Sequence, residues 1–116
     1  MKYLKKYPVT YKDVKYEVRW EPASDYDTSL KLVIYKVEHK QWWFGVKTIY
    51  TPVFYEYQSV ISVRLSYANH YRDVDSQDLY INEVKALFEF YEEDMQKKEL
   101  EKTQRDRLEA WDGVIK

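Results

Sequence analysis

The sequence predicts an α+β fold, in which an antiparallel sheet of about four strands is packed by one long C-terminal helix. The first observation is an alternation of apolar and polar residues with period two between residues 14 and 67, which is typical of strands. The second is a change, after residue 76, to apolar residues at helical spacing. The third is the shortness of the connections between the predicted strands, which favours antiparallel pairing.

The 116 residues suffice for a single domain. It comprises a basic, Tyr-rich N-terminal segment at residues 1–13, the sheet at 14–67 and the helix at 76–112. The chain has no Cys and only two Gly. It therefore lacks the residues for disulfides and thiol nucleophiles, and for the Gly-rich loops that bind nucleotide phosphates. The net charge of -1 gives no overall attraction to polyanions.

The predicted strands are Val14–Glu21, Leu30–Glu38, Trp42–Thr51 and Val53–Tyr67. The second strand has apolar residues on both faces, so we expect it at the centre of the sheet. Pro52 ends or kinks the third strand, because proline cannot donate a ladder hydrogen bond. The fourth would span roughly 45–50 Å at ~3.3 Å per residue, which is too long for this domain. A bulge or turn is therefore expected near Gln58 and Ser59.

A helix is predicted from Ser76 to Trp111, with Asp75 or Ser76 as its N-cap. On a helical wheel, one apolar side of this helix is suited to packing on the sheet. Its residues include Val84, Leu87, Phe88, Tyr91 and Met95. Beyond Met95 the same side of the helix is charged, so we expect the contact with the sheet to end there.

A second apolar stripe lies on the opposite side of the helix. It comprises Leu100, Gln104, Leu108 and Trp111. A continuous helix would be ~54 Å long at 1.5 Å per residue, longer than a compact domain of this size. Residues 96–112 are therefore expected to project, to fold back or to meet another chain. Homodimerisation through this segment ranks first, because a symmetric contact covers the stripe with a second copy of itself.

We expect a small, non-enzymatic binding module that acts through protein–protein contacts. More than half of the aromatic residues fall between Trp20 and Tyr71. They either pack a second face of the sheet and shield its edges, or form a recognition surface, since Tyr and Trp are enriched at protein interfaces. The candidate interface residues are Leu100, Gln104, Leu108, Trp111, Tyr55 and Tyr57. The sequence does not identify the protein partner.

Nucleic-acid binding is the alternative function. The N-terminal region interleaves basic residues with aromatic rings, and single-strand binders use this combination to contact phosphates and bases. The candidate contacts are Lys2, Lys5, Lys6, Tyr7, Lys12, Lys15 and Arg19. Alternating Lys and Tyr is equally typical of a half-exposed strand, so both interpretations stay open.

No catalytic, cofactor-binding or metal-binding residues are predicted. The acids near His70 lack the Gly and the terminal Glu of an EF-hand, and we interpret them as acids at the start of a helix. They are Asp73, Asp75 and Asp78. No stretch is long and apolar enough to span a membrane and no secretory signal is evident, so we expect a cytoplasmic protein without a membrane partner. In composition the chain is similar to small accessory proteins of phages and mobile elements of low-GC Gram-positive bacteria, which implies a protein that modulates a host macromolecule.

Overall fold

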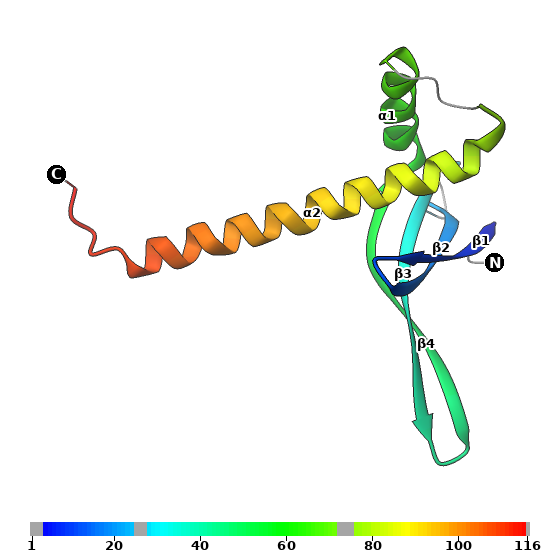
Figure 1. Ribbon diagram of the computed structural model, residues 1–116, viewed down its shortest axis with the longest axis horizontal. Coiled ribbons are helices and arrows are strands. Elements are labelled where there is room, and N and C mark those ends of the chain that lie inside the picture. Colours follow the sequence, from blue (N-terminus) through cyan, green and yellow to red (C-terminus); the bar gives the residue numbers. More distant parts are fainter. Residues whose placement is uncertain (1–3, 25–27, 72–75, 116) are drawn as a thin grey trace.

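The computed structural model describes the backbone of residues 4–24, 28–71 and 76–115, and the side chains of these residues except 68–71 and 76. The predicted fold class is confirmed, since a four-stranded antiparallel sheet is packed by a long C-terminal helix (Figure 1). The strands, which pair in chain order, are β1 (Lys5–Tyr11), β2 (Val14–Pro22), β3 (Leu30–Trp42) and β4 (Gly45–Tyr57). The helices are α1 (Gln58–Tyr71), the 3₁₀ helix η1 (Ser76–Asp78) and α2 (Leu79–Ala110).

The sheet begins earlier than predicted, because part of the N-terminal segment forms the edge strand β1. β1 pairs with β2 from Lys5 opposite Trp20 to Tyr11 opposite Val14. The two residues between the strands, Lys12 and Asp13, have φ angles of 50° and 63°. Two successive left-handed residues match a type I′ turn, whose twist suits a tight hairpin. This hairpin was not predicted because Lys-Asp is not among the usual dipeptides of such turns.

The prediction of two separate strands at Trp42–Thr51 and Val53–Tyr67 was wrong. Trp42 ends β3, and β4 runs without interruption from Gly45 through Pro52 to Tyr57. Ile34 pairs with Phe54, but its neighbour in β3 pairs with Pro52, so one residue of β4 has no opposite partner. The kink expected at Pro52 is therefore a bulge within one strand, a usual place for proline in a sheet.

The segment that follows β4, predicted as the second half of a strand, is the helix α1. Ile61 and Leu65 contributed to the period-two pattern, but residues four apart also share one side of a helix. Ile61 is fully buried and Leu65 packs against the core, whereas Val63 is exposed. The break expected near Gln58 is thus the start of a helix.

Helix α2 lies across one face of the sheet, and α1 packs against α2 (Figure 1). The buried core consists of Tyr16, Val18, Trp20, Leu32, Ile34, Ile61, Ala86, Leu87 and Phe88. The predicted packing side of α2 is confirmed at Leu87 and Phe88, with Val84 and Tyr91 partly buried against the core. Met95, the last residue of that side, is already exposed.

Helix α2 is continuous past Met95, a point that the sequence left open although no Gly or Pro interrupts this segment. Its N-cap is Asp78, whose side chain makes no capping hydrogen bond. The predicted N-caps are thus corrected: Ser76 begins η1, and Asp75 lies outside the described residues. At the other end, the Trp111 backbone N–H donates to the Leu108 carbonyl at 3.3 Å.

Two segments project from this packed body, and we name them the helix arm (residues 96–111) and the hairpin arm (residues 37–50) (Figure 1). The hairpin arm starts after Lys36, the last residue of β3 that pairs with β2. The radius of gyration is 18.7 Å, against about 13 Å for a compact domain of this length. The two arms account for this extended shape.

Candidate functional site

The helix arm is exposed along its whole length. Every residue from Gln96 to Trp111 is exposed, including the four predicted interface residues Leu100, Gln104, Leu108 and Trp111. Leu108 is 65 % exposed and Trp111 49 %. Of the three expectations for this segment, the structure shows projection, and the arm does not fold back onto the sheet.

The helix arm is held by local contacts and by its continuity with the packed half of α2. Lys98 pairs with Asp94 at 3.0 Å, and the Thr103 hydroxyl donates to the Glu99 carbonyl at 3.0 Å. Pairs of this kind contribute only a few tenths of a kcal/mol each, and isolated helices of this length are marginal in water. An arm of this kind gains stability from any partner that covers its apolar stripe.

The hairpin arm ends in three exposed aromatic side chains. Trp42 ends β3, and Trp43 and Phe44 occupy the turn, where they are 90 % and 76 % exposed. The Trp43 and Phe44 rings stack with their centroids 5.1 Å apart, and Trp42 meets Phe44 edge-on at 5.2 Å. Gly45 closes the turn with φ +137°, a conformation that side chains rarely adopt. Turn positions usually hold Gly, Asn, Asp, Ser or Pro, so this aromatic tip departs from local turn preferences.

Basic side chains lie just behind the aromatic tip. Lys40 and Lys47 are directly opposite one another in the β3–β4 ladder, and both are exposed. Among the described residues, no carboxylate pairs with either lysine within 4 Å. The sequence from His39 to Tyr55 contains no acidic residue, and the His39 ring contacts the Thr48 hydroxyl at 3.1 Å. The outer part of the hairpin arm is therefore a basic, aromatic surface.

The sheet face turned away from α2 carries a network of tyrosines and charged residues. The Arg19 guanidinium lies 4.4 Å from the Tyr35 ring centroid and 4.8 Å from that of Tyr50, and it pairs with Glu17 at 2.6 Å. The Tyr35 hydroxyl donates to Glu21. Burial, reinforced by this hydrogen bond, raises the pKa of Tyr35 to about 12. These side chains contact one another, so this part of the face is a second layer of packed side chains.

Tyr55 and Tyr57, the remaining predicted interface residues, lie on the same face of β4. Their rings meet edge-on with centroids 5.8 Å apart, and Lys31 lies 5.2 Å from the Tyr55 centroid. Both tyrosines line a shallow groove of about 540 Å³ together with Asp94 and Lys98 of α2. The structure thus brings Tyr55 and Tyr57 to the base of the helix arm.

The predicted nucleic-acid contacts do not form one surface. By the register of the β1–β2 ladder, Lys5 and Tyr7 lie on the side that faces the core, whereas Lys6, Lys15 and Arg19 lie on the opposite side. Lys5 lies 3.8 Å from the Tyr80 ring centroid, and Arg19 is engaged by Glu17. Lys2 lies outside the described residues, and Lys12 pairs with α2.

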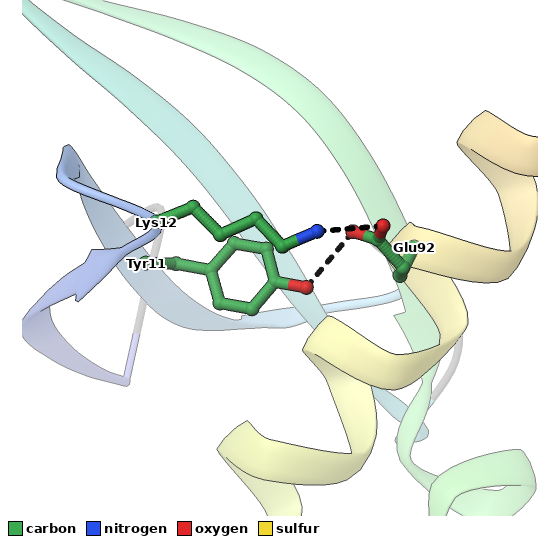
Figure 2. Close-up of polar contacts among 3 residues, drawn as sticks. All are labelled: Tyr11, Lys12 and Glu92. Carbon is green, nitrogen blue, oxygen red and sulfur yellow. Dashed lines mark hydrogen bonds and ion pairs between the residues drawn. The ribbon is translucent and has the colours of Figure 1, made fainter.

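The contact of Lys12 with α2 joins the β1–β2 turn to the helix (Figure 2). Glu92 accepts one hydrogen bond from the Lys12 ammonium and one from the Tyr11 hydroxyl, each at 2.8 Å. The hydrogen bond from Lys12, and after it the one from Tyr11, lowers the pKa of the Glu92 carboxyl. Each bond in turn raises the pKa of its donor, the Tyr11 hydroxyl or the Lys12 ammonium. The cluster fixes the edge strand onto α2, and this use of Lys12 was not foreseen.

Glu83 is a buried acid that the sequence analysis also missed. It is 2 % exposed, and it accepts hydrogen bonds from the Gln58 amide at 2.9 Å and from the Trp20 indole at 3.4 Å. Its position one residue before Val84 on the packing side of α2 was the available signal. Through these two hydrogen bonds Glu83 joins β2, α1 and α2 within the packed core.

The described residues hold no group of three or more His, Asp or Glu side chains arranged to bind a metal ion. Of the acids considered for a cation, Asp78 is the N-cap of α2, and the side chains of His70, Asp73 and Asp75 lie outside the described set. Within the described chain, no helix combines the length and apolarity needed to cross a membrane. Comparisons with models of protein families, with curated proteins and with solved structures find no match to this chain.

Proposed function

We propose that this protein is a small, non-enzymatic binding module that acts through protein–protein contacts, with the helix arm as its main interaction surface. The observation that carries the proposal is the exposed stripe of Leu100, Leu108 and Trp111 on a helix that extends beyond the body. Apolar surface left in water is unfavourable by ~25 cal/mol per Å², and a partner that covers the stripe recovers this free energy. Tyr55 and Tyr57 line a separate groove with Asp94 and Lys98 near the base of the arm, a second candidate contact surface.

The proposed partner is a second copy of the chain. Two helix arms that pack antiparallel about a two-fold axis at Gln104 place Leu100 of each copy opposite Leu108 of the other, because the two residues are equally far from Gln104. The same register places Trp111 opposite Lys97, whose aliphatic stem can cover the ring. Residues 97–112 hold five basic and five acidic side chains, so net charge does not oppose the pairing.

The test is light scattering at tens of micromolar protein. We expect the wild type to exceed the monomer mass of 14.3 kDa, and the double variant Leu108→Glu with Trp111→Glu to return to it. The control is Trp43→Glu, which places one such charge on the hairpin arm and should leave the mass unchanged. A wild type that stays at 14.3 kDa refutes the homodimer. A dimer that survives both helix charges places the contact elsewhere.

A different protein partner remains within the proposal if the wild type is monomeric. In that case, capture from lysate should depend on the helix arm, so that wild type retains a protein that the Leu108→Glu, Trp111→Glu variant loses and the Trp43→Glu variant keeps. A small accessory protein of a phage or mobile element, acting in the cytoplasm, is the setting that the composition favours. If the Leu108→Glu, Trp111→Glu variant still captures the protein, a role for the helix arm is refuted.

Nucleic-acid binding through the N-terminal region stands as the alternative. Support comes from Lys6 and Lys15, which are exposed on one side of the β1–β2 hairpin. Retention on heparin at ~50 mM salt with loss by ~200 mM would indicate phosphate-type contacts, because counterion release makes such binding steeply salt-dependent. If Lys6→Gln with Lys15→Gln elutes at the same salt as wild type, this alternative is refuted.

A further inference from the structure

We propose that the hairpin arm binds single-stranded nucleic acid, with Trp43 and Phe44 stacking on bases and with Lys40 and Lys47 contacting phosphates. This inference goes beyond protein binding by the helix arm and uses a different surface of the molecule. It rests on two departures from local sequence rules that occur in the same short segment.

The first departure is electrostatic. Like charges directly opposite one another on a two-stranded ladder destabilise it, and Lys40 faces Lys47 across the hairpin arm. The nearest acid along the chain, Glu38, makes no ion pair with Lys40, and the next acid after it is Glu56. An anion bound between the two ammonium groups relieves their repulsion, which a neutral partner does not.

The second departure is the aromatic turn. A two-stranded hairpin without a third strand or a covering helix is marginally stable in water, and exposed aromatic rings in its turn add nothing to the core. Trp43 already stacks on Phe44 at 5.1 Å with an interplanar angle of 29°. Because Trp43 is 90 % exposed, a base can extend this stack on the ring surface that Phe44 leaves free.

The spacing of the two features suits a nucleotide. Lys40 and Lys47 lie two to three residues behind the turn, which corresponds to about 7–10 Å along a strand. A lysine side chain is long and flexible, so its ammonium can approach the phosphate of a nucleotide whose base stacks at the tip. Lys36 lies farther back on the same ladder face and can meet the next phosphates of an extended strand.

A single strand fits this surface better than a duplex does. Base faces are available for stacking only where bases are unpaired. A duplex, whose bases are paired and stacked, offers the exposed Trp43 and Phe44 rings no free base face to contact. Basic side chains combined with stacking rings are the features used by single-strand binders that tolerate many sequences.

The test is fluorescence anisotropy of a labelled oligothymidine of about 12 nucleotides, a length within the usual site sizes of single-strand binders. With two phosphate contacts the logarithmic salt slope is about −1.4, so affinity should fall about 7-fold between ~50 and ~200 mM salt. Lys40→Gln with Lys47→Gln should abolish most of this dependence. Trp43→Ala or Phe44→Ala should weaken binding by roughly 5-fold to 150-fold, the range of one lost base stack.

The matched control is Lys85→Gln with Lys102→Gln, which removes the same number of charges from exposed positions of α2 and should leave affinity unchanged. Circular dichroism should show the wild-type fold for all variants, because the altered residues lie outside the core. Absence of oligothymidine binding at ~50 mM salt overturns the proposal. So does equal loss of binding in the Lys85, Lys102 control, or retention of the protein on phosphatidylserine vesicles alone.

The outcome is independent of the proposed self-association. Leu108→Glu with Trp111→Glu should still bind oligothymidine, because the helix arm and the hairpin arm share no residue. Failure of the nucleic-acid proposal therefore leaves the helix-arm proposal standing, and the converse also holds.

Discussion

Truncation of Leu87 tests whether α2 is anchored where the structure places it. Leu87 is fully buried in the core between the sheet and the helices. Replacing a buried leucine with alanine removes its apolar contacts and leaves a cavity, which together reduce the free energy of unfolding by ~2–5 kcal/mol. Leu108→Ala is the matched control, because it makes the same substitution in the same helix at a side chain that is 65 % exposed.

The expected magnitudes separate the two variants clearly. For 116 residues, the unfolding entropy is about 0.24 kcal/mol per kelvin at the melting temperature, taking about 2.1 cal/mol/K per residue. Leu87→Ala should therefore lower Tm by roughly 8–20 °C. Leu108→Ala should shift Tm by no more than about 2 °C, since exposed substitutions stay within about 0.5 kcal/mol.

The assay is thermal unfolding followed by circular dichroism at low micromolar protein, where self-association adds little to stability. Urea unfolding at 25 °C gives a second measure of the same difference. Equal shifts for the two variants, or a Leu87→Ala variant with wild-type Tm, would refute the packing of α2 on the sheet. A drop for Leu108→Ala that appears only at high protein concentration would instead support the dimer.

Two further variants test polar contacts. Glu83→Ala should lower the free energy of unfolding in urea by about 2–4 kcal/mol, because it leaves the donors of Trp20 and Gln58 without an acceptor. Glu83→Gln keeps one acceptor oxygen and should lower it less. Equal losses for the two variants would refute this role of Glu83. For Glu92, the hydrogen bond from Lys12 lowers the carboxyl pKa below 4.5 in the folded state, so the associated stability is present above pH 4.5 and is lost as the pH falls through the lower folded value. The Tm of Glu92→Gln should therefore fall less steeply than that of wild type below pH 4.5, and parallel profiles would contradict the assignment.

The long helix was predictable because its signal is redundant. Apolar residues from Val84 to Met95 recur at helical spacing over about three turns, and no Gly or Pro lies between Ser76 and Gly113. Length alone left three outcomes open for the helix arm, namely projection, folding back or contact with another chain, because ~1.5 Å per residue carries a continuous helix beyond a domain of this size. The identity of the arm's partner depends on the surface of that partner, and no pattern in this sequence describes it.

The errors arose where one pattern fits two structures. Ile61 and Leu65 satisfy both the period of a strand and that of a helix, and only the packing of Ile61 into the core decides between them. β1 was missed because its turn needs two left-handed residues, and Lys12 and Asp13 adopt them without the Gly that usually marks such a turn. In both cases tertiary contacts override the local preference.

The two arms are the parts of the chain where local rules and structure disagree most. Trp43 occupies a turn position, Lys40 faces Lys47, and Trp111 is exposed on the projecting helix arm. Sequences that specify one fold avoid such conflicts in their cores, and departures from local rules concentrate where a protein binds its partners. Because neither arm contributes to the core, selection for stability alone gives no reason to retain these side chains. Contacts made by the arms with other molecules do give such a reason, and variants confined to one arm separate those contacts from folding.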